Sequence, residues 1–315
     1  MALTRLLESA AEFEPEPDAP GRRRGRVREP KPPRPAREPR PAGTGARRPL
    51  LQGTGVALML VALLVLGFFV YLYGLSGLSE QRAQSVLYKT FAGRLSQAVA
   101  PTGPTGDGAP VAILNIPALG MSDVVVVEGT SAQDLTHGPG HVRSSVLPGQ
   151  YGVSEIYGRY AAYGGPFAHL MRLQRGDRIM VTTGQGTATY IVESFGTTAH
   201  PSPDPTRNRL VLETGEGTTI PGGWVQVSAD LWSAPQATPA GRPAITAQEL
   251  ALAGDPNALV PLVFWAQALV LVSLAGALAA YRWARLPALL CTAPAALALV
   301  WAVYENISLL LPNLY

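Results

Sequence analysis

Cysteine is almost absent from this 315-residue chain, and lysine and histidine are scarce. Cys291 is the one thiol, so no disulfide can form within the chain. Its place in an apolar stretch favours inert packing over catalysis. The four histidines, His137, His141, His169 and His200, lack the spacing of metal ligands. We therefore expect neither a metal site nor a cofactor.

A strongly basic folded domain is also absent. Residues 1–49 hold 12 Lys and Arg against 7 Asp and Glu, whereas residues 76–257 hold 11 against 14. A nucleic-acid-binding domain would carry its positive charge on the folded unit. The distribution therefore argues against a nucleic-acid partner.

Three long apolar stretches predict membrane-spanning helices at residues 50–75, 258–281 and 286–311. The Arg- and Pro-rich residues 1–49 contain few apolar side chains and are predicted to be a disordered tail. Basic residues before the first span and in the loop at 282–285 place both segments in the cytoplasm under the positive-inside rule. The chain is thus predicted to be a multi-pass plasma-membrane protein, with membrane lipid as a partner and its middle domain outside the cell.

Residues 76–110 connect the first span to that domain. Apolar side chains recur every four residues along the first part of this connection: Leu87, Phe91, Leu95 and Val99. The spacing predicts a juxtamembrane helix from Ser79 to Val99, with Ser79 as its N-cap. We expect the apolar stripe to pack against the domain or a partner, and residues 101–110 to form a flexible spacer.

Between residues 111 and 231 the pattern changes to short apolar and β-branched runs. The runs are Val111–Ile116, Val124–Val127, Arg178–Thr183, Thr187–Ser194, Leu210–Glu213 and Val225–Ala229. Short strands at this spacing predict a closed or nearly closed antiparallel β-barrel. The Pro- and Ala-rich residues 232–257 are predicted to link the barrel to the second span.

Several ordered motifs lie between Gly138 and Ile179. A GPGH segment at 138–141 leads to an LPG turn at 147–149, then to a PF pair at 166–167 and a GD turn before Ile179. This order resembles the sortase family, and its actinobacterial class E or D members in particular. The resemblance covers about residues 111–231 and implies a mainly β, sortase-like closed barrel outside a Gram-positive cell. The low lysine and high Ala, Gly and Pro content is likewise typical of actinobacteria.

The residues that the family uses for catalysis are replaced here. The resemblance puts the family's histidine at Arg159, its cysteine at Gly215 and its arginine near Gly223. A sortase needs a thiolate to form the acyl-enzyme and an imidazole to move a proton. Gly215 has no side chain, and Arg159 stays charged at ordinary pH, so neither can take those roles. The resemblance therefore implies the fold without the catalytic residues.

Three functions remain open. The first is a catalytically inactive envelope protein with a role in surface-protein sorting. Its groove would bind a sorting-signal peptide, an active sortase or another envelope protein. The residues expected to line that groove are His141, Arg159, Thr214 and Gly215. The second is an active transpeptidase or hydrolase that works without cysteine, and the third is a structural subunit of a membrane complex, which a buried groove would favour.

Arg159 would pair with a carboxylate of the ligand in the first function, or else form an ion pair with Glu155 or Glu213. The second function needs a hydroxyl within reach of His141 or His169. Ser144, Ser145 and Ser154 lie in this region, but no G-x-S-x-G elbow surrounds them, which argues against a serine hydrolase.

Overall fold

The computed structural model of the chain describes residues 47–200, 208–216 and 222–315. The tail predicted over residues 1–49 lies almost wholly outside the described residues. The helices are α1 (Arg47–Val70), α2 (Ser76–Ser96), α3 (Leu259–Arg282) and α4 (Arg285–Leu309), and a π-helical turn, Tyr71–Leu75, joins the first two. The strands are β1 (Pro110–Ile116), β2 (Met121–Glu128), β3 (Gly140–His141), β4 (Val153–Tyr157), β5 (Arg178–Thr183), β6 (Gly186–Thr197), β7 (Arg209–Gly215) and β8 (Trp224–Leu231). The barrel belongs to the larger of two compact units, Val56–Tyr315.

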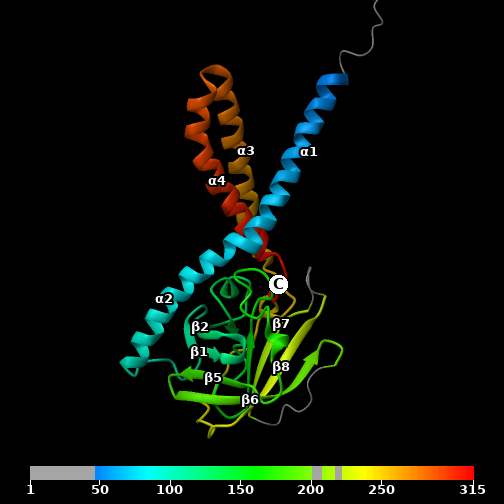
Figure 1. Cartoon of the computed structure of the whole chain (residues 1–315). Helices are drawn as coiled ribbons and strands as arrows, with labels where there is room; N and C mark the ends of the chain where they lie inside the picture. The colour runs from blue at the N-terminus through cyan, green and yellow to red at the C-terminus, as the bar shows by residue number, and fades with distance from the viewer. Residues whose placement is uncertain (1–46, 201–207, 217–221) are drawn as a thin grey trace, which may run out of the picture. The chain divides into compact units, whose positions relative to one another are not determined.

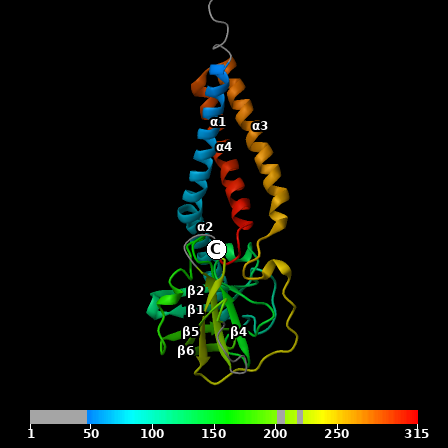
Figure 2. The same ribbon diagram turned by 90° about the vertical axis from the view of Figure 1, so that its right-hand side faces the viewer.

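The strands close into a barrel in the order β1-β2-β3-β4-β7-β8-β6-β5, and β5 pairs back to β1 (Figures 1 and 2). The predicted closed barrel is confirmed, and every predicted run lies within a strand. The expectation of an antiparallel barrel is wrong, because β2 pairs with β3, and β4 with β7, in parallel. Parallel neighbours need long crossover connections. Residue periodicity locates a strand but does not identify its partner.

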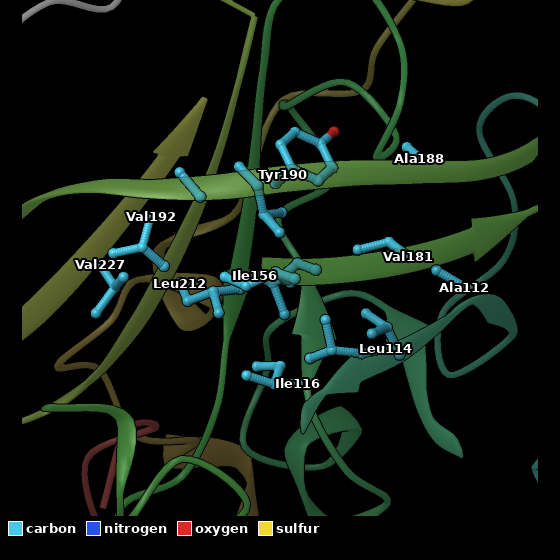
Figure 3. Packing of buried hydrophobic residues seen from close by; sticks show 14 of the residues in the cluster. Ala112, Leu114, Ile116, Ile156, Val181, Ala188, Tyr190, Val192, Leu212 and Val227 are labelled. Atoms are coloured by element: carbon cyan, nitrogen blue, oxygen red, sulfur yellow. The ribbon is translucent and has the colours of Figure 1, made fainter. Parts of the chain in front are cut away.

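Alternate residues of the strands point into the barrel and form its core. Leu114 and Ile116 of β1 meet Ile156 of β4 and Tyr190 of β6, and all four side chains are buried (Figure 3). Burying one such side chain contributes roughly 1.5–3 kcal/mol. All seven residues of β7 are buried, so its outer face is covered as well as its inner one.

The helices α1, α3 and α4 belong to three helical stretches that are long and apolar enough to cross a membrane. Helices α3 and α4 run side by side (Figure 1), and Gly276 lies so close to Thr292 that a Cβ atom at Gly276 would be 2.9 Å from the Thr292 hydroxyl oxygen. The small residue therefore permits this close approach of the two helices.

The juxtamembrane helix does not start at Ser79, as the sequence predicts. The helix runs on from α1 through the π-helical turn, and Ser79 lies within α2. The Ser76 hydroxyl donates to the Leu72 carbonyl at 2.6 Å, and the Ser79 hydroxyl donates to the Ser76 carbonyl at 2.6 Å. Such bonds satisfy serine within a helix, so a serine is a cap only where the backbone leaves the helical conformation.

The apolar stripe of α2 packs against the barrel, which confirms the expected contact. Phe91 is fully buried against Ile113 of β1 and Val125 of β2, and Leu87 and Leu95 border the cluster. The fourth predicted member of the stripe, Val99, lies beyond the end of the helix and is 62% exposed.

Candidate functional site

The ends of β4 and β7 bring together most of the predicted site residues. Tyr157 pairs with Glu213 in the parallel register, and the Gly158 amide donates to the Glu213 carbonyl at 2.9 Å. Arg159 therefore follows β4 next to the place where Thr214 and Gly215 end β7. Trp224, which opens β8, pairs with Gly215 and comes directly after Gly223. Residues about 60 positions apart in the chain thus meet at one end of the barrel.

His141 faces the interior of the barrel. It pairs with Ile156, whose side chain points into the barrel core, and paired residues of neighbouring strands share a face. The imidazole is fully buried, with Nδ1 3.0 Å from Glu128 Oε2 and Nε2 2.8 Å from the Val146 carbonyl oxygen. We therefore assign His141 a structural role and place it outside the proposed groove.

A hydroxyl does lie within reach of this histidine. Ser145 Oγ is 3.1 Å from His141 Nε2, so Ser145, His141 and Glu128 have the connectivity of a catalytic triad. The Val146 carbonyl can only accept a hydrogen bond, so Nε2 must carry a hydrogen to donate to it. A protonated Nε2 cannot remove the proton of Ser145. The arrangement therefore stabilises the β3–β4 connection and does not activate a nucleophile.

Arg159 is fully buried at the end of β4. Its Nη2 donates to the Ala132 carbonyl at 2.9 Å, and its guanidinium carbon lies 4.9 Å from the centre of the Tyr163 ring. Nε and Nη1 have no partner among the described residues. Burial lowers the pKa of the guanidinium to about 10, which leaves it charged at neutral pH. The expected alternative, an ion pair with Glu155 or Glu213, is not formed within the described part of the chain.

The loop after Arg159 is held in a strained conformation. Tyr163 has a φ of 52°, which is unusual for a bulky residue, and Gly164 and Gly165 follow with φ of 74° and 52°. Such backbone persists only where the surroundings fix it. The Tyr163 amide donates to the Ser76 hydroxyl at 3.0 Å, and its phenol oxygen lies 2.7 Å from Ser308 Oγ. The loop is thus tied to the start of α2 and the end of α4.

Two carboxyl groups lie on the outward face of β4 and β7, where Glu213 is buried and Glu155 is half-buried. Glu155 and Tyr157 of β4 share this face with Glu213 of β7, because Ile156 and Leu212 point into the core. Burial, and then the nearby charge of Glu155, raises the pKa of Glu213 to about 7, and burial raises the pKa of Glu155. We call Glu155, Tyr157 and Glu213 the acidic face. The sequence suggested these two glutamates only as partners of Arg159. The alternation of apolar and polar residues along the two strands could have indicated that both glutamates lie on the outward face.

The acidic face has few features of a cofactor or metal site. Among residues 47–200, 208–216 and 222–315, no three His, Cys, Asp or Glu side chains gather closely enough to hold a metal ion. Thr214 is 1% exposed, and its hydroxyl has no described partner. The arrangement offers a buried cation at Arg159, a proton-binding carboxyl at Glu213 and unpaired donors that a ligand could satisfy.

Comparison with known proteins identifies the barrel. Residues 114–219 match the family model of the sortase domain. The chain carries a sortase domain. The motifs from Gly138 to Ile179 lie inside the matched region, as do Arg159 and Gly215. No curated protein matches the chain by sequence.

Solved sortase structures are similar to the sortase domain. A sortase D5 transpeptidase from Clostridium perfringens is 20% identical, with 48% of this chain and 99% of that chain covered and a TM-score of 0.42. Sortase E from Streptomyces avermitilis is 29% identical, with 41% and 91% covered and a TM-score of 0.36. Sortase A from Corynebacterium diphtheriae is 18% identical, with 48% and 84% covered and a TM-score of 0.37.

Proposed function

We propose that this protein is a catalytically inactive sortase of the cell envelope that binds peptides during surface-protein sorting in a Gram-positive actinobacterium. The placement of Arg159 and Gly215 at the adjoining ends of β4 and β7 carries the proposal. The position that the family resemblance gives to the nucleophile is a glycine, and Cys291 lies in α4. No side chain at Gly215 can form an acyl-enzyme.

Arg159 supplies the binding chemistry. Its Nε and Nη1 are buried without a described partner, and a buried guanidinium gains more from a carboxylate than from a neutral acceptor. An acidic group of a peptide, or the carboxylate of a sorting-signal segment, fits this requirement. The neighbouring Thr214 hydroxyl offers a further hydrogen bond.

Orientation in the membrane is part of the proposal. Arg282 and Arg285 flank the turn between α3 and α4, and basic residues precede α1, so the positive-inside rule places these ends in the cytoplasm and the barrel outside. Single cysteines at Trp283 and at the exposed Thr187, in a Cys291→Ser background, test this with a membrane-impermeant maleimide on intact cells. We expect labelling at residue 187 and none at residue 283, and the reverse pattern would contradict the orientation.

The binding test uses the full chain in lipid nanodiscs with fluorescent LPxTG-like and LAxTG-like peptides and an amine acceptor. We expect at least one peptide to bind without cleavage, and Arg159→Ala to weaken binding at least tenfold. Thr182→Ala, a change at an exposed hydroxyl on β5, is the matched control and should leave affinity unchanged. Turnover above a heat-inactivated control would overturn catalytic inactivity.

A structural role in a membrane complex is the second candidate, and burial favours it. Arg159 is fully buried, and Tyr157 and Glu213 are each 9% exposed, so the acidic face is largely covered within the chain itself. In that case no peptide of either class binds, and Arg159→Ala lowers the stability of the barrel without affecting any ligand. The same nanodisc samples, heated with and without peptide, separate the two functions.

A further inference from the structure

Leu314, which packs against Tyr157 of the acidic face, comes from the far end of the sequence. Asn313 and Leu314 are fully buried, and Tyr315 is 3% exposed. We call Asn313–Tyr315 the inserted segment. It lies beside the barrel end of the membrane helices, where the letter C marks the chain end in both views (Figures 1 and 2).

One edge of the inserted segment is held by the linker that precedes α3. The Asn313 side-chain amide donates to the carbonyls of Gln248 and Leu250 at 2.7 and 2.8 Å. The backbone amide of Asn313 donates to the Ala253 carbonyl at 2.7 Å. This side therefore recognises asparagine through its two amide hydrogens.

The other edge is held by the strained loop after Arg159. The Tyr160 amide donates to the Leu314 carbonyl at 2.9 Å. The amides of Ala161 and Ala162 both donate to the Tyr315 carbonyl oxygen, at 2.7 and 3.0 Å. Three successive backbone donors thus converge on two successive carbonyl oxygens. The Tyr315 amide donates to the Pro312 carbonyl at 2.9 Å, so these donors hold the segment as a turn.

The side chains of the inserted segment fill two apolar clusters. Leu314 packs with Leu135, Val142, Tyr157 and Trp224. Tyr157 is the last residue of β4, and Trp224 is the first residue of β8 and pairs with Gly215 at the end of β7. Leu314 therefore lies where β4 and β7 end and β8 begins. Tyr315 packs with Leu72, Ala162 and Tyr163.

The fit leaves several polar atoms unsatisfied. Within the described residues, Asn313 Oδ1, Arg159 Nε and Nη1, and Thr214 Oγ1 are buried without a hydrogen-bond partner. A buried polar atom without a hydrogen-bond partner destabilises the occupied state, so a better-matched peptide can compete with the inserted segment. The apolar contacts and the backbone donors would serve either occupant equally.

We infer that this end of the barrel is a peptide-binding site that the chain itself occupies. Its ligand is a turn-forming peptide with asparagine, then an aliphatic residue, then an aromatic residue, supplied by a partner protein in exchange for the inserted segment. The inference rests on the proposed peptide-binding function and specifies its ligand. In the occupied state, a peptide must displace the inserted segment before it can bind.

The test uses the full chain in nanodiscs and a fluorescent, acetylated and amidated peptide, Leu-Leu-Pro-Asn-Leu-Tyr. Leu314→Asp puts a charge into the apolar cluster and should expel the inserted segment. We expect this variant to bind the peptide at least tenfold more tightly than the unmodified chain. Leu252→Asp, a partly exposed leucine on the same linker, is the matched control and should bind like the unmodified chain. A peptide with aspartate at the Leu314 position should bind at least tenfold more weakly.

Equal peptide affinity in the Leu314→Asp variant and the unmodified chain would overturn the inference. If the Leu314→Asp variant does not fold, Asn313→Ala removes two hydrogen bonds and keeps the apolar contacts. The amides of Tyr160, Ala161 and Ala162 should then exchange with deuterium at least tenfold faster, and added peptide should slow them again. If the deuterium exchange of these amides is unchanged in Asn313→Ala, the inference is likewise overturned. The proposed function is tested separately, with the LPxTG-like and LAxTG-like peptides. Its failure can therefore be told apart from failure of this inference.

Discussion

Replacing Glu213 with glutamine should change how the stability of the barrel depends on pH. Burial, and then the charge of Glu155, raises the pKa of Glu213 from 4.5 to about 7. A carboxyl group with a higher pKa in the folded state binds its proton more tightly there. Its protonation favours folding below the unfolded pKa, and this advantage is lost as the pH rises through the folded pKa.

The magnitude follows from the two pKa values. Each pKa unit corresponds to 1.36 kcal/mol, so the free energy of unfolding should fall by about 3 kcal/mol between pH 4.5 and pH 8 because of Glu213 alone. Glutamine resembles the protonated carboxyl in shape and cannot ionise. Glu213→Gln should therefore equal the unmodified chain near pH 4.5 and be more stable by about 3 kcal/mol near pH 8.

Pulse proteolysis in urea, on the full chain in nanodiscs, measures this difference at each pH. Glu193→Gln, on an exposed position of β6, controls for the change of charge. Glu155→Gln removes the neighbouring charge and should reduce the pH dependence that Glu213 causes. If the free energy of unfolding changes with pH in the same way for Glu213→Gln and the unmodified chain, the prediction is wrong. That result would mean that Glu213 has the same pKa in the folded and the unfolded state.

Three further substitutions test the packing. Leu114→Ala, in the barrel core, should lower the free energy of unfolding by about 2–5 kcal/mol in urea denaturation, and an equal effect of Trp232→Ala at an exposed site would contradict the assignment. Gly158→Ala drives a Cβ atom into the Phe167 ring and should cost about 1–3 kcal/mol, whereas Gly93→Ala, with open space around it in α2, should be neutral or stabilising. Phe91→Ala should cost about 3–5 kcal/mol and should make α2 accessible to protease, and a helix that stays protected would argue against its docking on the barrel.

Local pattern was enough to predict most strands of the barrel. Runs such as Arg178–Thr183 alternate between buried and more exposed residues, and alternation is a property of a single strand. Strand β3 has two residues and is too short to show alternation, and β4 carries Glu155 in a short run. The parallel pairing of β4 with β7 joins segments more than 50 residues apart, which no local pattern reports.

The sequence suggested residues of the candidate site only where a family motif marked them. The order of family motifs was enough to bring Arg159 and Gly215 to neighbouring strand ends. The raised pKa of Glu213 was not predictable, because it arises first from burial in the folded chain. The inserted segment was missed for the same reason: Leu314 and Tyr157 lie about 150 positions apart and share no periodicity.

Tyr163 links the ends of two helices to the candidate site. Its backbone amide is bonded to Ser76 in α2, its phenol lies against Ser308 in α4, and its ring packs with Tyr315 and lies under Arg159. Releasing the inserted segment removes one of these contacts and leaves the strained backbone of Tyr163 with less support. A peptide that replaces the segment must restore that support. Exchange at the site is therefore coupled to the ends of α2 and α4, and a partner that moves either helix would change how readily the site accepts a peptide.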